Sequence, residues 1–191
     1  MVDAPYTVLI VDPDPETLED YVAFLDRQYE VTTAQSADEA LARASKADVV
    51  LLNRRLPDRS GDEVATALAD RGTTQTVALL STVDPGPDIV DLPCDDYLLK
   101  PLSESDLLDA VDRLVRRVEY DDRLAEYASL TAKRAALESA VSMPDLLGDP
   151  EYDTLCERCE ALRRDLDGLV TEFGTDDFEA AFRALGPGND D

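Results

Sequence analysis

The stretch Asp48 to Pro57 reads D-V-V-L-L-N-R-R-L-P and decides the fold class of this chain. A short apolar run rich in β-branched residues indicates a strand buried on both faces, as in a parallel sheet. The run ends at Asn53, and a loop containing a proline follows. We therefore expect Asn53 at the carboxyl end of a parallel strand, where open α/β sheets display their functional side chains.

Four further apolar runs flank this one, and amphipathic segments separate them through residue 117. The five runs are Tyr6–Val11, Tyr29–Thr33, Val49–Leu52, Thr76–Leu80 and Tyr97–Leu99. Helices are expected at Glu16–Leu25, Ser36–Ala44 and Gly61–Leu68, weakly near Pro87–Asp91, and from a capping box that begins at Ser103. The pattern predicts a doubly wound α/β domain with a five-stranded parallel sheet of the flavodoxin type.

After residue 118 the pattern becomes helical only. One helix is expected from Tyr120 to Val141, a breaker-rich segment from 142 to 150, and a second helix from Tyr152 to Phe173 with a coiled-coil seam. Such helices form an antiparallel hairpin or pair with a second copy. We therefore divide the chain into a sheet domain (1–118), a helical hairpin (119–174), and a short helix with a flexible acidic tail (175–191).

The net charge of the chain limits the classes of molecule that it can bind. Lys and Arg number 18 against 43 Asp and Glu, which gives a net charge of -25. Such a surface repels nucleic-acid phosphates and anionic lipid, so we expect neither partner and favour adaptation to high cytoplasmic salt over one specific cationic partner. No signal peptide and no apolar run approaching ~20 residues is present, so a cytoplasmic protein is expected.

The three cysteines are expected to be reduced thiols. Cys156 and Cys159 form a C-x-x-C, but no second pair and no His completes a zinc site. Cys159 falls on the helical seam, so helix packing is favoured over a metal or redox role. Cys94 lies alone in the sheet domain.

Polar residues follow four of the expected strands. Asp12-Pro13-Asp14 follow the first strand, Asn53 the third, Ser81 the fourth and Lys100 the fifth, with Tyr97 three residues earlier. Because parallel strands end at one edge of the sheet, these side chains are expected to form one pocket.

This constellation resembles the receiver domain of response regulators over residues 6 to 118. The resemblance implies that Asp12 is one of the acids that hold Mg²⁺. It further implies that Ser81 is the hydroxyl that binds a phosphoryl group, Lys100 the lysine that pairs with it, and Tyr97 the switching aromatic. The phosphate-accepting Asp of that family corresponds to Asn53, and its second acid corresponds to Pro13.

These two departures affect the chemistry. An amide cannot form an aspartyl phosphate, and Mg²⁺ requires hard anionic oxygens, so Asp12 alone is a weak metal site unless Asp14 compensates for Pro13. The remaining residues also have structural interpretations: Lys100 can pair with Asp12, Ser81 can cap a loop, and Tyr97 can be a half-buried strand aromatic. Arg54 and Arg55 are interpreted as solvated loop charges or partner contacts.

The C-terminal segment resembles the HalX domain, which follows receivers in halophilic archaea. The similarity covers about residues 118 to 174, and its most specific stretch is K-R-A-A-L-E at 133–138. It implies a helical interaction module.

We therefore expect a non-enzymatic, atypical response regulator of two-component phosphorelay signalling, with a pseudo-receiver that acts through a histidine kinase or another signalling protein. A homodimer through the seam is an open alternative to the intramolecular hairpin. One rival function is a conventional switch phosphorylated on another carboxylate, such as Asp14 or Asp58. Another is a transcriptional regulator.

Overall fold

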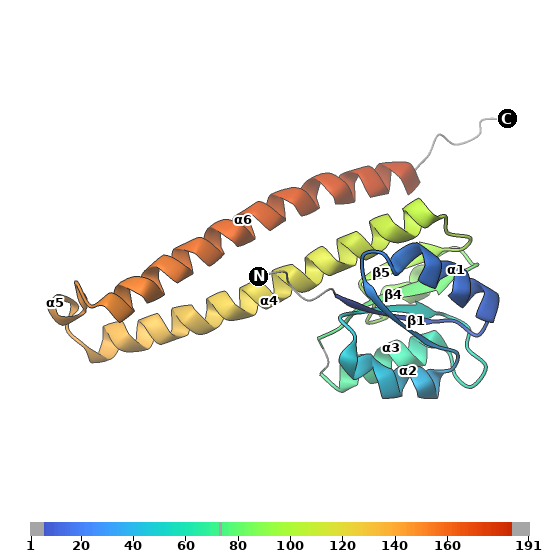
Figure 1. The fold of residues 1–191 in the computed structure, drawn as a ribbon, viewed down its shortest axis with the longest axis horizontal. Helices are drawn as coiled ribbons and strands as arrows, with labels where there is room; N and C mark the ends of the chain where they lie inside the picture. The colour runs from blue at the N-terminus through green and yellow to red at the C-terminus, as the bar shows by residue number, and fades with distance from the viewer. Residues whose placement is uncertain (1–5, 73, 185–191) are drawn as a thin grey trace. The chain divides into compact units, whose positions relative to one another are not determined.

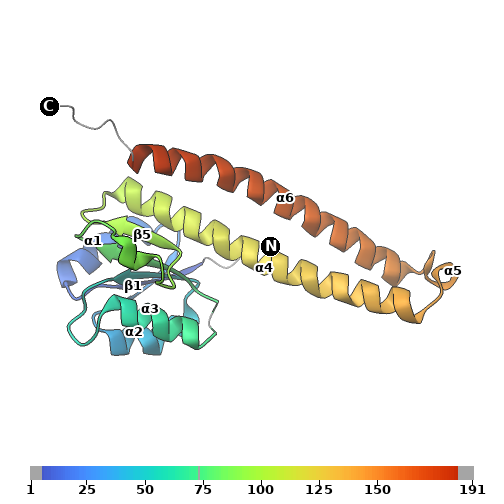
Figure 2. The same ribbon diagram turned by 180° about the vertical axis from the view of Figure 1, so that it is seen from behind.

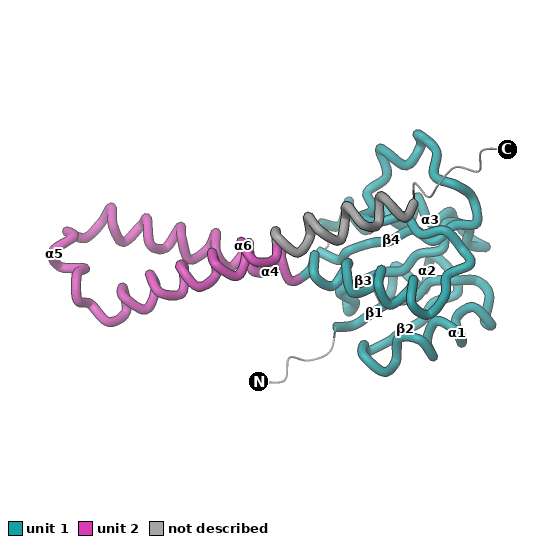
Figure 3. Tube along the Cα trace, turned by 90° about the horizontal axis from the view of Figure 1, so that it is seen from above, with its two compact units in different colours: residues 1–118 teal, residues 119–191 magenta. Residues whose placement is uncertain are grey.

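The structure, a computed structural model, describes residues 6–72 and 74–184, with side chains up to residue 169. The chain divides into two compact units, residues 1–118 and 119–191 (Figure 3). Each unit is described here by itself.

The first unit is built on a parallel sheet (Figure 1). Its strands are β1 (Thr7–Val11), β2 (Glu30–Ala34), β3 (Val49–Asn53), β4 (Thr76–Ser81) and β5 (Asp96–Leu99). Their spatial order is β2-β1-β3-β4-β5, and every neighbouring pair is parallel. The predicted doubly wound five-stranded sheet is thereby confirmed.

Helices cover both faces of the sheet, which explains the unbroken apolar runs of the central strands. The helices of this unit are α1 (Pro15–Leu25), α2 (Ala37–Arg43), α3 (Gly61–Asp70) and the start of α4 (Glu104–Ala140), with a 3-10 turn η1 (Ala44–Lys46) after α2. α1 and the start of α4 pack in one core cluster, while α2 and α3 pack in another on the opposite face (Figures 1 and 2). β1 supplies both clusters alternately, with Ile10 in the first and Val11 in the second.

Side chains cap the starts of three helices, of which the cap at Ser103 was predicted. Ser60 and Glu63 form a reciprocal capping box at α3, and Ser103 exchanges the corresponding hydrogen bonds with Asp106 before α4. Ser36 caps α2 by accepting a hydrogen bond from the Glu39 N–H.

The segment between β4 and β5 contains much less helix than the sheet pattern suggests. Only one 3-10 turn, η2 (Pro87–Ile89), lies within the weak helix expected near Pro87–Asp91. The sequence P-G-P at 85–87 explains this, because proline lacks the N–H that extends a helix and glycine weakens it.

Both edges of the sheet carry charge. β2 begins at Glu30, and β5 is only four residues long. Asp96 in β5 forms an ion pair with Arg113, and Asp95 just before the strand forms one with Arg117.

The second unit is an antiparallel helical hairpin made by the rest of α4, the short α5 (Met143–Leu146) and α6 (Pro150–Ala184) (Figures 1 and 2). Two boundaries differ from the predictions. α4 is one helix from Glu104 to Ala140, because no Gly or Pro interrupts the sequence around Val118. α6 continues to Ala184, so the short helix expected from residue 175 is not a separate element. The expected flexible tail from 185 lies outside the described residues.

The α6 seam is buried within the hairpin at most of its predicted positions. Its buried residues are Tyr152, Cys159, Leu162, Leu166 and Leu169. On α4, however, Leu124 and Leu137, which lie within the helix expected from Tyr120 to Val141, are exposed. The intramolecular hairpin therefore buries the α6 seam more fully than these two leucines of α4. No helix in the described ranges is long and apolar enough to cross a membrane.

Candidate functional site

Four strands deliver polar residues to one edge of the sheet. Asp12, Asn53, Ser81 and Lys100 lie at or just after the carboxyl ends of β1, β3, β4 and β5, which are neighbours in the sheet. The parallel arrangement therefore places them at one edge, as the sequence predicted.

Asp12 is the centre of this edge. Its residue is only 1% exposed, and its Oδ2 accepts hydrogen bonds from the Lys100 ammonium and from Asn53 Nδ2, the latter at 3.1 Å. Its Oδ1 accepts from the Asp14 backbone N–H at 3.0 Å. Both carboxylate oxygens are therefore engaged within the protein.

Lys100 and Asp12 form a nearly buried ion pair. The Lys100 side chain is 14% exposed, and its ammonium lies 6.0 Å from the centre of the Tyr21 ring. Burying either charge alone would cost several kcal/mol, and the partner offsets that cost. The Asp12–Lys100 ion pair, which the sequence allowed as a structural interpretation, is thus present.

Asn53 uses both ends of its amide. Nδ2 donates to Asp12, and Oδ1 accepts a hydrogen bond from the Arg55 backbone N–H at 3.3 Å. Gly61 packs against the same strand end, where an added Cβ would lie 2.5 Å from the Asn53 carbonyl oxygen and 2.9 Å from Arg54 Cα. This close backbone approach holds the end of β3 against the first turn of α3.

Asp14 does not bring its carboxylate to this cluster. It caps α1, where its Oδ2 accepts hydrogen bonds from the Thr17 hydroxyl at 2.6 Å and the Thr17 N–H at 3.2 Å. The Thr17 hydroxyl in particular lowers the pKa of this carboxyl. The backbone N–H of Asp14 hydrogen-bonds to Asp12, while its carboxylate serves as the α1 cap and also feels the charge of Lys100.

Ser81 points into the loop that follows it. Its hydroxyl accepts a hydrogen bond from the Val83 N–H at 3.0 Å, and its carbonyl accepts one from the Lys100 N–H at 2.8 Å. Ser81 is buried and adjoins the Asp12 cluster through the backbone. This is the loop-capping role that the sequence allowed.

Tyr97 is half-buried and has a fixed hydroxyl. The hydroxyl donates to the Val83 carbonyl at 2.9 Å and accepts from Arg54 Nη1 at 3.3 Å. Tyr97 packs against the core cluster formed with α2 and α3. It is therefore a strand aromatic whose polar end fastens the loop after β4.

Arg54 is not the solvated loop charge that one interpretation of the sequence suggested. Its side chain is only 20% exposed and binds both carboxylate oxygens of Asp62, with Nε to Oδ1 at 3.0 Å and Nη2 to Oδ2 at 3.0 Å. It also pairs with Asp88 and lies 5.9 Å from the Tyr97 ring centre. These hydrogen bonds, above all those to Asp62, raise its pKa above the ordinary value. Arg54 thus joins the loop after β3, the start of α3 and the η2 turn.

One contact of Arg54, the ion pair with Asp62, could have been predicted from the sequence. Asp62 lies in the first turn of a helix that begins directly after the Arg54 loop, so an ion pair across the turn could have been expected. Arg55, by contrast, is exposed, and its side chain fits the solvated interpretation.

Asp58, the second alternative phosphate acceptor, hydrogen-bonds to the start of α2. Its two carboxylate oxygens accept hydrogen bonds from the backbone N–H groups of Ala37 at 2.9 Å and Asp38 at 3.0 Å, at the start of α2. These donors, Ala37 first, lower the pKa of Asp58. Asp58 therefore acts as a helix cap.

The donor set at the sheet edge does not fit Mg²⁺ as it is arranged. Mg²⁺ prefers one or two free carboxylates, whereas Asp12 is bound to Lys100 and Asn53, and Asp14 caps α1. Within the described ranges, no three His, Cys, Asp or Glu side chains converge where they could hold a metal ion.

The fold and the residues at its edge define the class of protein: a receiver-type α/β signalling domain joined to a helical module. Comparison with known proteins gives the family. The response regulator receiver domain matches residues 8–112, and the HalX domain matches residues 116–182. The chain belongs to the response regulator receiver family and carries a HalX domain after the receiver.

Related sequences include regulators of different lengths. A Haloferax volcanii protein, provisionally named a transcriptional regulator, is 36% identical over 169 residues, which is 87% of this chain and 29% of that protein. The sensory transduction protein RegX3 of Mycolicibacterium smegmatis is 32% identical and covers 78% of this chain and 71% of its own length. The transcriptional regulatory protein AruR of Pseudomonas aeruginosa is 32% identical, over 59% of this chain and 50% of its own.

Solved receiver structures match the first unit. A CheY-like receiver domain protein of Methanospirillum hungatei aligns with a TM-score of 0.57 and 25% identity, over 62% of this chain and 99% of its own. The chemotaxis protein CheY4 of Vibrio cholerae aligns with a TM-score of 0.54 and 28% identity, over 58% and 99%.

Proposed function

We propose that this protein is an atypical response regulator of two-component signalling. In this proposal Asn53 stands at the phosphate-accepting position, and the protein acts in the cytoplasm through protein–protein contacts without catalysing a reaction. The observation that carries it is the shared contact on Asp12 Oδ2, where Lys100 and Asn53 both bind. The ammonium that would pair with a phosphoryl group is paired with a buried carboxylate instead.

The side chain of Asn53 supports this proposal chemically. Phosphoryl transfer needs a nucleophilic oxygen and a metal that neutralises the developing charge. Asn53 presents a neutral amide whose two polar atoms are already hydrogen-bonded. The alternative carboxylates Asp14 and Asp58 are both engaged as helix caps.

The test is phosphorylation with acetyl phosphate and Mg²⁺, followed by intact mass measurement. We expect no adduct on the natural chain, little on Asn53→Asp, and a stoichiometric acid-labile adduct on the double variant Asn53→Asp with Pro13→Asp. Circular dichroism of each variant checks that it is folded. An adduct on the natural chain would contradict the proposal, and mapping it to Asp14 or Asp58 would establish the conventional switch.

The proposed partner is a histidine kinase or another signalling protein. A second copy of the chain is the other candidate, because the exposed Leu124 and Leu137 leave apolar surface on the hairpin. Light scattering of the full chain in molar salt separates these cases. A monomer at micromolar concentration would exclude the homodimer as the working form.

A second candidate function, transcriptional regulation, rests on the names of the relatives, among them AruR. Against it stands the net charge of -25, which opposes phosphate contacts. Fluorescence anisotropy with promoter DNA at physiological salt tests it. We expect no binding below micromolar concentration, and nanomolar sequence-specific binding would favour this second function.

A further inference from the structure

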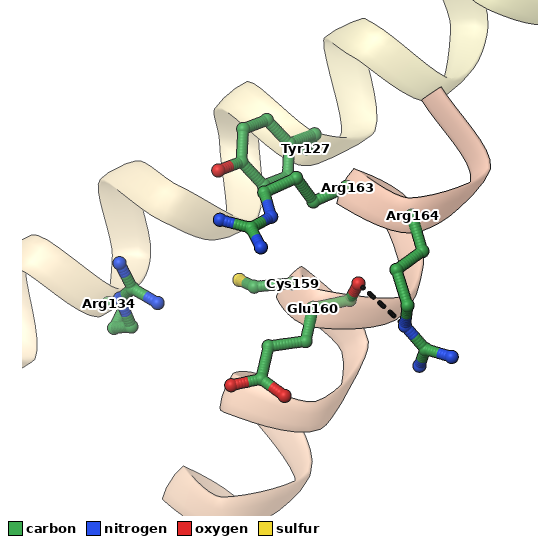
Figure 4. Close-up of a pocket in the computed structure, with 6 residues that line it drawn as sticks. All are labelled: Tyr127, Arg134, Cys159, Glu160, Arg163 and Arg164. Atoms are coloured by element: carbon green, nitrogen blue, oxygen red, sulfur yellow. Dashed lines mark hydrogen bonds between the residues drawn. The ribbon is translucent and has the colours of Figure 1, made fainter. Parts of the chain in front are cut away.

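The helical hairpin contains a pocket that lies apart from the sheet edge. It has a volume of about 360 Å³ and is lined by Tyr127, Arg134, Cys159, Glu160, Arg163 and Arg164. Figure 4 shows that Arg134 on α4 and Arg163 on α6 flank the Cys159 thiol, while Arg164 turns away from them. Two helices far apart in sequence thus contribute cations to one pocket.

Two of the three lining arginines have no carboxylate partner among the described residues, although the chain has 43 acids and 18 bases. Among the described residues, Arg163 and Arg164 form no ion pair with a carboxylate. Arg164 donates to the backbone carbonyl of Glu160 at 3.3 Å. Arg134 forms an ion pair with Glu138 one turn along α4, with Nε and Oε1 3.5 Å apart. Elsewhere in the chain, Lys100 and Arg54 are tightly paired with acids.

Glu160 lines the same pocket and is the obvious internal partner for these cations. It sits three and four residues before Arg163 and Arg164 on α6, the spacing at which helical ion pairs form. Within the described part of the hairpin, however, no ion pair joins Glu160 to either arginine. The guanidinium charge therefore stays available to an external anion.

The pocket also has a less polar wall. Cys159 is 3% exposed, and the half-buried ring of Tyr127 lies beside the Arg163 guanidinium (Figure 4). Guanidinium groups present paired N–H donors that match the oxygens of phosphate and carboxylate, and a volume of this size suits a small molecule.

We propose that this pocket binds a small ligand through an oxoanion, either a phosphate or a carboxylate group. Arg134 and Arg163 bind the anion from the two facing helices, and the Tyr127 ring and the Cys159 surface contact the remainder of the ligand. Because the anion joins α4 to α6, binding stabilises the hairpin. This site is independent of the proposed function of the sheet edge.

The test is thermal unfolding of the full chain at constant ionic strength with four probes: inorganic phosphate, adenosine monophosphate, succinate, and chloride as the reference. We expect a rise in Tm of about 3 °C or more for at least one oxoanion over chloride. A response to phosphate alone identifies free phosphate as sufficient, a response only to the nucleotide identifies an organic phosphate, and a response only to succinate identifies a carboxylate ligand. No rise with any oxoanion would overturn the proposal.

Matched variants locate the effect. Arg163→Gln and Arg134→Gln should each abolish the rise, whereas Lys133→Gln, which removes one charge from an exposed position beside the pocket, should keep it. Anion binding at the sheet edge would survive both arginine replacements. A rise that persists in Arg163→Gln, or that disappears in Lys133→Gln, would therefore contradict the assignment to this pocket.

Discussion

The sheet edge of the first unit and the pocket of the second unit both contain cationic side chains, but they differ in whether these cations have carboxylate partners. At the sheet edge, Lys100 faces Asp12 and Arg54 faces Asp62, so each cation is matched inside the protein. In the hairpin pocket, Arg163 has no carboxylate partner among the described residues. Whether a cation has a carboxylate partner nearby, rather than the net charge of -25, therefore indicates where an anion can bind.

The largest expected effect concerns the matched charges of the sheet edge. Asp12→Ala should lower the free energy of unfolding by about 3–5 kcal/mol, because it leaves the nearly buried Lys100 without its partner. Urea denaturation measures this change. Asp14→Ala is the control from the same loop and should cost less, because it removes only a helix cap.

A double variant tests whether the loss of stability in Asp12→Ala comes from the unpaired charge of Lys100. Lys100→Met combined with Asp12→Ala removes both charges and should recover part of the lost stability. If Asp12→Ala costs no more than Asp14→Ala, the pairing at the sheet edge is not what stabilises it.

The next prediction compares the change in stability when a glycine is replaced by alanine at a crowded position and at an open position. Gly61→Ala should destabilise the protein by about 2 kcal/mol, because its Cβ would collide with the Asn53 carbonyl. Gly168→Ala in α6 meets nothing within 4 Å and should stabilise by about 0.5–1 kcal/mol, since alanine favours the helix. Thermal and urea unfolding of both variants measure the difference, and changes of the same sign would refute it.

A smaller effect is expected at the arginine that joins three segments. Arg54→Gln should cost about 1 kcal/mol, discounted for its partial exposure, and should speed proteolysis of the loop after β4. Arg55→Gln, at the exposed neighbour, should stay within about 0.5 kcal/mol of the natural chain. Equal effects at both positions would mean that the Arg54 contacts contribute little.

The smallest effect depends on pH. The pKa of Asp58 is lowered in the folded protein by the N–H groups of Ala37 and Asp38, so its contribution to stability is present above its unfolded pKa. That contribution is lost as the pH falls through the folded pKa. Asp58→Asn should therefore reduce stability slightly at neutral pH and flatten its acid dependence. Unfolding midpoints between pH 2 and 6 measure this, and an unchanged slope would contradict it.

The sequence predicted the sheet well because its signals are local. Each strand end is marked by a polar residue after an apolar run, and the parallel fold converts that spacing into one edge. The Asp14 cap was not predicted, although Asp14, Pro15 and Thr17 together form a helix-start signature. The unbroken α4 differs from the prediction because the hydrophobic pattern changes at residue 118, although no helix-breaking residue lies there.

Other features depend on tertiary register and could not be predicted. Arg54 meets Asp88 only because the loop after β4 folds over the end of β3. Arg134 and Arg163 lie 29 positions apart in the sequence, and the register of the hairpin alone brings them to one pocket. Such contacts require knowing which turns of two helices face each other.

The charged last strand has a consequence for self-association. Exposed sheet edges promote pairing with another chain, and natural proteins suppress this with short strands and charges. β5 has only four residues; its Asp96 pairs with Arg113, and Asp95 just before the strand pairs with Arg117. A short strand with charged side chains is a poor template for the addition of another strand. The protein is thus guarded against amyloid-like growth at β5, and assembly by strand addition there is disfavoured.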